Sequence, residues 1–107
     1  LDLGWCGGFT QGLKMVEKTK QTGVKIAPHD CTGPIGLIAG LHLSLASENA
    51  LIQETVRASL RTWYPHVVTN LPIIKDSKIS LSNENGLGAS LKKEFAESKQ
   101  MKIVKIS

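Results

Sequence analysis

Short apolar runs and longer amphipathic stretches alternate along the first half of the chain. Residues 24–28 and 49–54 have the length and composition of buried strands, and residues 1–3 have the pattern of a strand end. The segments between them, residues 10–22 and 34–46, have the apolar spacing and the boundary residues of helices. This order of strand, helix, strand, helix and strand predicts an α/β fold with a parallel sheet.

Apolar positions on the two helices predict which faces are buried. On the first helix, Leu13 and Val16 form the apolar stripe, and Gly23 marks the C-terminal end. On the second helix, four aliphatic side chains repeat at helical spacing: Leu37, Ile38, Leu41 and Leu45. We therefore expect the helices to form the outer layer of strand–helix units.

The pattern changes after residue 54, where the elements become short. The expected elements are a helix over residues 55–64, an irregular stretch between Pro65 and Pro72, an edge strand at residues 79–81, a helix over residues 90–97 and an exposed strand over residues 101–106. The chain also starts without Met, inside an apparent strand end. We therefore expect a C-terminal piece of a longer protein, with weak stability of its own because both sheet edges would be unpaired.

Three ionisable side chains stand where the apolar runs give way to polar or glycine-rich loops. They are Asp2, His29 and Glu54, which are 27 and 25 residues apart, about one strand, loop and helix per step. In neighbouring parallel strands joined by right-handed crossovers, the C-terminal ends meet at one rim. The three groups are therefore expected to converge on a shared ligand.

Each of these candidates has two interpretations. An Asp2–His29 pair is a general-base arrangement, because the carboxylate fixes the imidazole tautomer and stabilises the imidazolium. Alternatively, His29 is a polar residue at the start of a helix and Asp2 caps a loop. Glu54, if protonated in an apolar site, can donate a hydrogen bond to a bound anion. Alternatively, it pairs with Arg57, three residues along the chain.

Other polar and aromatic residues are weaker candidates. His42 lies within an apolar helix and is predicted to pack there, and His66 is predicted to lie at the surface. Trp5 and Trp63 are predicted to pack in a core or against another domain. Cys31 follows a histidine by two residues, a spacing that rarely aims an imidazole at a thiol outside a tight turn.

Charge and cysteine usage narrow the class of protein. The net charge is +4, and residues 92–107 hold five lysines and two glutamates, so most of the excess is local. This stretch lacks arginine clusters and has one aromatic residue, which favours a solvated surface over nucleic-acid binding. Cys6 and Cys31 have no metal-binding spacing and are interpreted as reduced thiols of a cytoplasmic protein. The longest uncharged stretch, residues 31–47, is too short and polar to cross a membrane.

Four motifs together resemble those of a known family. They are DLGWCGGFT at residues 2–10, APHDCTGP at 27–34, NALIQE at 49–54, and the stretch from LP at 71–72 to NGLG at 85–88. In this order and spacing they are similar to the enolase superfamily, in particular the mandelate racemase and muconate lactonising enzyme group. The resemblance covers nearly the whole chain.

The resemblance implies a fold and a division of the chain. It implies the last three strands and intervening helices of a (β/α)7β TIM-like barrel in residues 1–64. Residues 65–107 would form a C-terminal return segment that packs on the capping domain.

The resemblance also implies an activity. Asp2 and His29 would form the catalytic dyad, and Glu54 would hydrogen-bond the substrate carboxylate. The parent would be a Mg²⁺-dependent enzyme with its metal ligands and lysine base upstream, acting on a sugar acid and resembling acid-sugar dehydratases; we also expect a homo-oligomer. The alternatives are a racemase or cycloisomerase using the same dyad, or a non-catalytic fragment that lacks the metal site.

Overall fold

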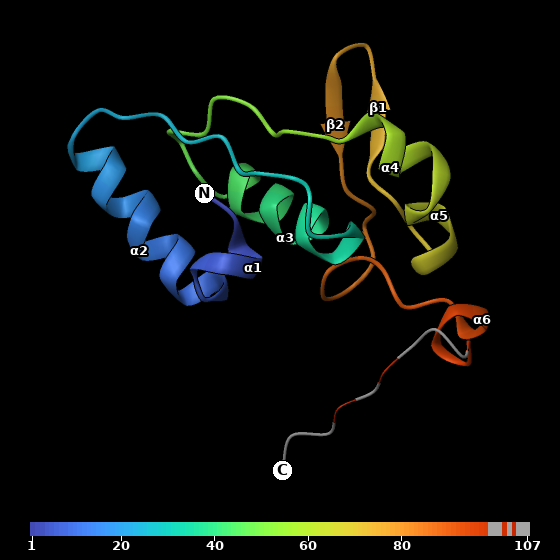
Figure 1. Ribbon diagram of the computed structural model, residues 1–107. Coiled ribbons are helices and arrows are strands. Elements are labelled where there is room, and N and C mark those ends of the chain that lie inside the picture. Colours follow the sequence, from blue (N-terminus) through green and yellow to red (C-terminus); the bar gives the residue numbers. More distant parts are fainter. Residues whose placement is uncertain (99–101, 103, 105–107) are drawn as a thin grey trace.

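The computed structural model describes residues 1–98, 102 and 104, and within them the regular elements are helices and one β-hairpin (Figure 1). The predicted strand over residues 101–106 falls largely outside the described residues. The elements are α1 (Leu3–Cys6), α2 (Gly8–Gln21), α3 (Pro34–Leu45), α4 (Arg57–Thr62), α5 (Tyr64–Val67), β1 (Ile73–Lys75), β2 (Lys78–Ser80) and α6 (Lys93–Ala96).

The segments predicted as parallel strands are extended and lie side by side, although they form only an isolated parallel bridge, between Ile26 and Ala50. Ile26 N donates to Asn49 O (3.0 Å), and Leu51 N donates to Ile26 O (2.8 Å). On the other side of residues 26–29, His29 N donates to Leu1 O (2.8 Å). The segment at residues 26–29 therefore lies between the other two, as predicted, but these three segments do not form regular strands.

A short helix, α1, forms directly after Asp2, where the glycines of the sequence favoured a loop. Asp2 caps α1, because its Oδ1 accepts a hydrogen bond from Gly4 N (2.7 Å). Gly7 ends α1 with φ 98°, a left-handed conformation that glycine adopts without a Cβ penalty. The chain then enters α2 at Gly8, two residues before the predicted start at Thr10.

The helices pack around a core cluster of Leu3, Val16, Ile26 and Leu43. Val16 was predicted to be buried, but its partner in the predicted stripe, Leu13, is 51% exposed. The buried surface of α2 is narrow and consists of Gly12 and Val16, and Leu13 lies outside it.

The second long helix, α3, is buried on a wider surface than a single stripe. Leu37, Ile38 and Leu41 are buried as predicted, whereas Leu45 is 63% exposed and Leu43 is buried instead. Leu43 faces the cluster with Leu3, and Ile38 faces a second cluster with Val67 and Val68. The two clusters contact α3 at Leu43 and Ile38 and do not include Leu45, so the predicted burial of Leu45 is wrong.

The second cluster joins α3 to the later part of the chain. Leu71, Leu81, Leu87, Ala89 and Phe95 pack against its buried residues. The division at residue 64 into a barrel part and a return segment stays a prediction. The structure adds that the described part of the later segment covers α3.

Several short elements differ from the predictions. The helix predicted over residues 55–64 is split into α4 and α5, and Pro65 lies in the first turn of α5, where its missing N–H is tolerated. The predicted edge strand at residues 79–81 corresponds to β2, which pairs antiparallel with the unpredicted β1. Asp76 and Ser77 connect them with φ of 50° and 58°, as a tight hairpin turn requires.

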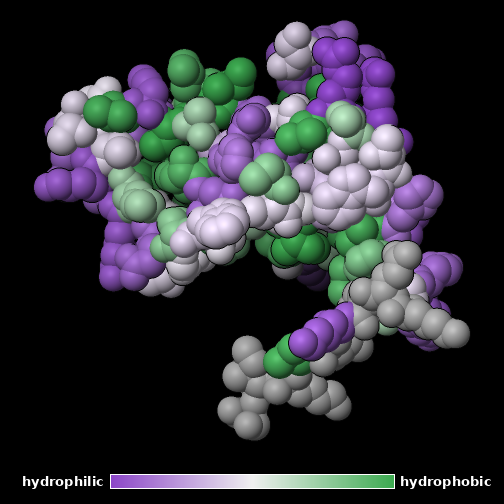
Figure 2. Space-filling view, in the orientation of Figure 1, coloured by the Kyte–Doolittle hydropathy of each residue, from purple (hydrophilic) through white to green (hydrophobic). Residues whose placement is uncertain are grey.

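Hydrophobic side chains gather along the upper edge of the molecule in Figure 2, over the extended segments. Val24, Leu51 and Ile52 of these segments are 53%, 72% and 64% exposed. An unpartnered apolar surface beside extended backbone is what an incomplete sheet presents. Among the described helices, each is too short or too polar to traverse a bilayer.

A candidate active site at the ends of the extended segments

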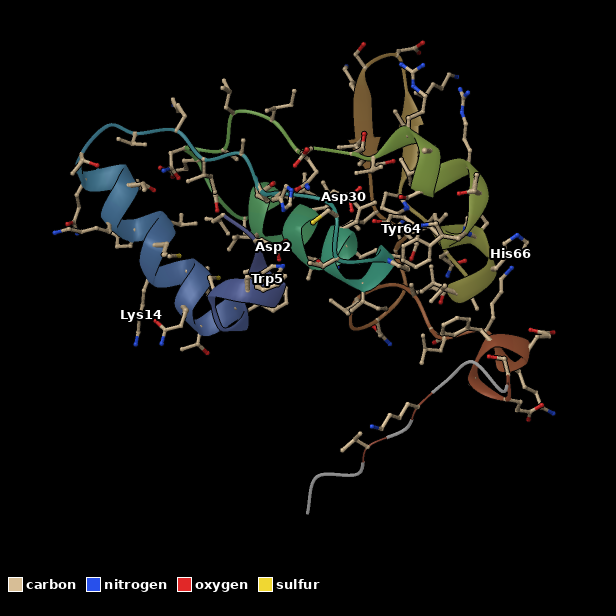
Figure 3. All side chains as sticks on the ribbon, in the orientation of Figure 1. Asp2, Trp5, Lys14, Asp30, Tyr64 and His66 are labelled. Carbon is tan, nitrogen blue, oxygen red and sulfur yellow. The ribbon has the colours of Figure 1, made fainter. Side chains whose placement is uncertain are left out.

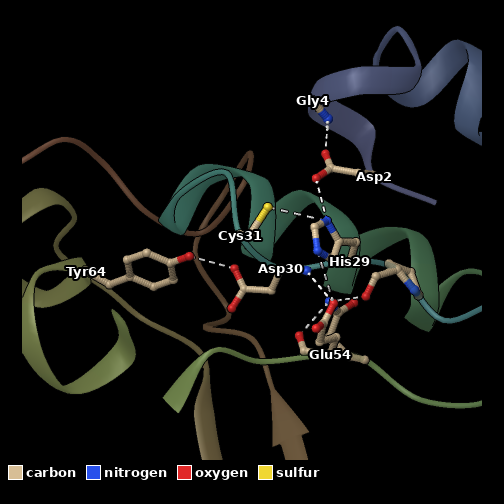
Figure 4. A network of polar contacts seen from close by, with 9 residues as sticks. Asp2, Gly4, His29, Asp30, Cys31, Glu54 and Tyr64 are labelled. Atoms are coloured by element: carbon tan, nitrogen blue, oxygen red, sulfur yellow. Dashed lines mark hydrogen bonds and ion pairs between the residues drawn. The ribbon is translucent and has the colours of Figure 1, made fainter. Parts of the chain in front are cut away.

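The three predicted site residues lie together (Figure 4). Asp2 Oδ2 is 3.1 Å from His29 Nδ1, and Glu54 Oε2 is 3.7 Å from His29 Nε2. The imidazole therefore lies between two carboxylates, with one ring nitrogen facing each. The side chains of His29 and Glu54 are 46% and 50% exposed, so this side of the imidazole is open to a ligand.

Period-two alternation along residues 26–30 explains the direction of His29. Ile26, Pro28 and Asp30 are buried against the helices, whereas Ala27 and His29 face the opposite side. Backbone hydrogen bonds bring the neighbouring segments to the same level, since His29 N donates to Leu1 O and Glu54 N donates to Pro28 O (3.2 Å). The chain topology therefore places the three side chains at one end of the extended segments.

Both carboxylates are held by backbone donors. Asp2 uses Oδ1 to cap α1, which leaves Oδ2 facing the imidazole. Glu54 Oε2 accepts a hydrogen bond from Asp30 N (3.1 Å). Such contacts restrict the side-chain rotamers, so the two carboxylates are oriented before any ligand binds.

Asp30 is a structural residue that the sequence reasoning missed. It is 1% exposed, its Oδ1 accepts a hydrogen bond from Tyr64 Oη (2.7 Å), and its Oδ2 accepts one from Val56 N (2.8 Å). Figures 3 and 4 show its carboxyl directed toward Tyr64 and away from Asp2. The carboxylate thus ties the residue after His29 to the segment after Glu54 and to α5. The sequence offered one signal for the burial of Asp30, which is that Asp30 follows Ile26 and Pro28 at every second position of an extended segment.

Tyr64 is fully buried beside this carboxylate. Burial, followed by the hydrogen bond to Asp30, raises the pKa of the Tyr64 phenol well above its ordinary value. The phenol therefore stays protonated and continues to donate to Asp30.

Cys31 contacts the imidazole, contrary to the expectation from its sequence spacing. Its Sγ is 3.5 Å from His29 Nδ1, on the ring side that also faces Asp2. Partial desolvation, followed by the nearby carboxylates of Asp2 and Glu54, raises the pKa of the Cys31 thiol. The sulfur is therefore a neutral thiol rather than an activated nucleophile.

The remaining candidates lie outside this cluster. His42 is half-buried, and its Nε2 donates to Leu87 O (3.2 Å), which agrees with the predicted packing role. His66 is exposed on α5, as predicted, although it lies in a helix rather than in an irregular stretch (Figure 3). Trp5 is 80% exposed and so is not part of a core in this chain. Trp63 packs edge-on against Tyr64, with ring centroids 4.5 Å apart.

The alternative pairing of Glu54 with Arg57 is not formed among the residues that the structure describes. Glu54 faces His29 and the backbone of Asp30 instead.

His29 and its two neighbours Asp2 and Cys31 form a group of three possible metal ligands. Ligand atoms of Asp2, His29 and Cys31 lie within 4.8 Å of one another. Mg²⁺ prefers six oxygen ligands, whereas this set offers one carboxylate, one imidazole and one sulfur. The set therefore does not fit Mg²⁺.

Comparisons with known proteins identify the family of this chain. A family profile described as enolase C-terminal domain-like matches residues 1–95. The chain belongs to this family. Its fold is the α/β C-terminal region of the enolase superfamily, which agrees with a fragment of a TIM barrel.

Two curated relatives are named as dehydratases. A D-galactonate dehydratase of Ralstonia nicotianae is 43% identical over 53 residues, or 50% of this chain and 14% of that protein. A D-galactonate dehydratase family member of Enterococcus gallinarum is 34% identical over 99 residues, or 90% of this chain and 24% of that protein.

Solved structures show the same fold. An enolase protein from Sargasso Sea environmental sequencing is 41% identical, with a TM-score of 0.84 over 94% of this chain and 27% of that chain. An enolase of the mandelate racemase subgroup from Agrobacterium tumefaciens is 40% identical, with a TM-score of 0.78 over 86% of this chain and 24% of that chain. The chain thus spans about a quarter of the solved structures that it resembles.

Proposed function

We propose that this chain forms the C-terminal part of an acid-sugar dehydratase, in which His29 transfers a proton. The single observation that supports this role is the position of the imidazole between Asp2 and Glu54. The dehydratase names of the relatives support the reaction type. The substrate class is a sugar acid with a hydroxyl group β to its carboxylate.

Asp2 acts as the positioning residue for His29. A carboxylate 3.1 Å from Nδ1 favours the tautomer with the proton on Nδ1 and stabilises the imidazolium. This tautomer leaves Nε2 with a lone pair on the side that faces Glu54. His29 thus has a defined atom, Nε2, through which a proton is exchanged with the substrate.

In the proposed reaction, Nε2 of His29 accepts the proton from the carbon next to the carboxylate, and the bond from the β carbon to its hydroxyl oxygen then breaks. The imidazolium of His29 donates its Nε2 proton to the departing hydroxyl, which leaves as water. Ketonisation of the resulting enol gives a 2-keto-3-deoxy acid. Glu54, which lies on the Nε2 side of the imidazole, is the hydrogen-bond partner of the substrate carboxylate.

The Mg²⁺ generally used by this superfamily would supply positive charge near the substrate carboxylate. Because the ligand set around His29 does not fit this ion, we expect its ligands in the part of the relatives that this chain does not match. No proton-transfer step assigned here to His29 depends on a metal bound by these residues.

Turnover of a sugar-acid library with Mg²⁺ by the full-length parent, of which this chain is the proposed C-terminal part, tests the proposal; the chain on its own is expected to be inactive. We expect a 2-keto-3-deoxy product, detected as its semicarbazone, from at least one acid. His29→Asn should abolish turnover while substrate binding, measured by calorimetry, is retained. His66→Asn is the matched control, because His66 is exposed on α5 and should leave turnover unchanged.

The products also separate the alternatives. An epimerised acid would indicate a racemase, and a product of the same mass with a new ring would indicate a cycloisomerase. Undiminished turnover in His29→Asn would refute the role of His29. Absence of turnover with every acid would support a non-catalytic fragment.

A further inference from the structure

Two donor atoms, one oxygen and one sulfur, lie beside Nδ1 of His29, and the three atoms together suit a softer cation than Mg²⁺. Asp2 Oδ2 is 3.1 Å and Cys31 Sγ is 3.5 Å from His29 Nδ1. All three atoms lie within 4.8 Å of one another. The three residues belong to two segments that backbone hydrogen bonding holds together, since His29 N donates to Leu1 O.

The two separations from Nδ1 are close to the edges of a zinc tetrahedron. With Zn–S near 2.3 Å, Zn–N near 2.1 Å and Zn–O near 2.0 Å, tetrahedral angles place nitrogen about 3.6 Å from sulfur and about 3.3 Å from oxygen. The observed distances of 3.5 and 3.1 Å are within a few tenths of an ångström of these values. The Asp2 oxygen and the Cys31 sulfur lie within 4.8 Å of each other, whereas a tetrahedral edge between them is about 3.5 Å, so enclosing the ion requires these two ligands to approach by up to about 1.3 Å.

The surroundings of the three ligands also suit a metal site. Asp2 is oriented by Gly4 N through Oδ1, which leaves Oδ2 available to the ion. The other ring nitrogen of His29 faces the Glu54 carboxylate at 3.7 Å, and a metal-bound histidine commonly has such a carboxylate behind it. The Cys31 side is exposed, which leaves room for water as a fourth ligand.

The geometry points to a binding site for Zn²⁺ or a similar thiophilic divalent cation at Asp2, His29 and Cys31, and its occupation inhibits the proton transfer. The inhibition rests on the proposed function, whereas the binding does not. The cation takes the place of the proton between Nδ1 and Asp2, so the His29 proton moves to Nε2, and the Cys31 thiol releases its proton to solvent as the thiolate binds. Neutral, metal-bound His29 then has no lone pair on Nε2 with which to exchange a proton with substrate.

Co²⁺ titration of the purified, reduced protein tests the site without any substrate. Four-coordinate Co²⁺ absorbs strongly in the visible, and a cobalt–thiolate bond adds a charge-transfer band in the ultraviolet. We expect both signals, displaced by Zn²⁺ and unaffected by excess Mg²⁺. Absence of the charge-transfer band, or its displacement by Mg²⁺, would overturn the proposal.

Matched cysteine variants identify the ligand. Cys31→Ser should remove the charge-transfer band and weaken cobalt binding by at least about tenfold, because a thiolate ligand is lost. Cys6→Ser should retain both, since Cys6 is outside the ligand group. Equal spectra of the Cys31→Ser variant and the unmodified protein would overturn the assignment. Asp2 is less informative as a test position, because it also caps α1.

Turnover measurements on the full-length parent test the inhibition separately. Zn²⁺ should inhibit the unmodified protein, and Cys31→Ser should require at least about tenfold more Zn²⁺ for the same inhibition. Cobalt–thiolate binding with undiminished turnover at saturating Zn²⁺ would overturn the inhibitory role. If no sugar acid is turned over, the proposed function fails, while the cobalt spectra still decide whether the site exists.

Discussion

Replacement of Tyr64 by phenylalanine should destabilise the protein, because it removes one of the two hydrogen bonds that hold the buried Asp30 carboxylate. Tyr64 Oη donates to Asp30 Oδ1 at 2.7 Å, and Asp30 is 1% exposed. A hydrogen bond to a charged group contributes about 1.5–3 kcal/mol, and an oxygen that loses its donor in a buried site cannot regain it from water. We therefore expect the free energy of unfolding to fall by about 2 kcal/mol.

Urea denaturation of the purified protein, followed by circular dichroism, measures this loss. With a slope of about 2 kcal/mol per molar urea, a loss of about 2 kcal/mol lowers the midpoint by about 1 M. Thr62→Val is the matched control, because it removes a hydroxyl whose hydrogen bond to Ala58 O is exposed and should cost less than about 0.5 kcal/mol. If the two variants unfolded at the same midpoint, the structural role of Asp30 would be wrong.

Three further variants or conditions test other parts of the structure. Because burial and the Asp30 hydrogen bond raise the pKa of Tyr64, the only tyrosine, its stabilising effect should be present below about pH 10 and lost as the pH rises further. In an absorbance titration the phenolate should appear only as the protein unfolds; ionisation of the folded protein near pH 10 would contradict this. Asp2→Asn preserves the helix cap but removes the charge beside His29, so turnover should fall about 10²–10⁴-fold with little change in KM, and unchanged turnover would refute the dyad. Gly88→Ala should lower the melting temperature more than Gly86→Ala. Both glycines have positive φ, but a Cβ at Gly88 would lie 2.7 Å from Ser82 Oγ, whereas a Cβ at Gly86 would meet nothing within 4 Å. Equal decreases in melting temperature would exclude a steric effect at Gly88.

The order of the extended segments and the convergence of three side chains followed from local patterns. Apolar runs and helix boundaries depend on residues that are close in the sequence. The extended segment at residues 24–28 and the helix at residues 34–46 could therefore be predicted from the sequence. His29 projects opposite to Ile26 and Pro28 because a pleated segment alternates its side chains, whatever the rest of the chain does. The catalytic roles of the three groups remain predictions.

The missed features depend on contacts between distant parts of the chain. Leu45 is exposed and Leu43 is buried because two separate clusters contact α3, which helical spacing alone does not reveal. The buried role of Asp30 depends on Tyr64, 34 residues away. The short helix α1 depends on a side-chain cap and a left-handed glycine, which compete with the loop that the same glycines suggest.

In the proposed mechanism, Asp2 fixes the tautomer of His29 so that Nε2 exchanges a proton with substrate. Nitrogen-15 NMR of the histidine side chains measures this tautomer directly, and His29→Gln assigns the signal among the three histidines. The dyad predicts a proton on Nδ1 of neutral His29 in the metal-free protein and a shift toward the Nε2–H form in Asp2→Asn. An Nε2–H tautomer in the unmodified protein, or no change in Asp2→Asn, would contradict it.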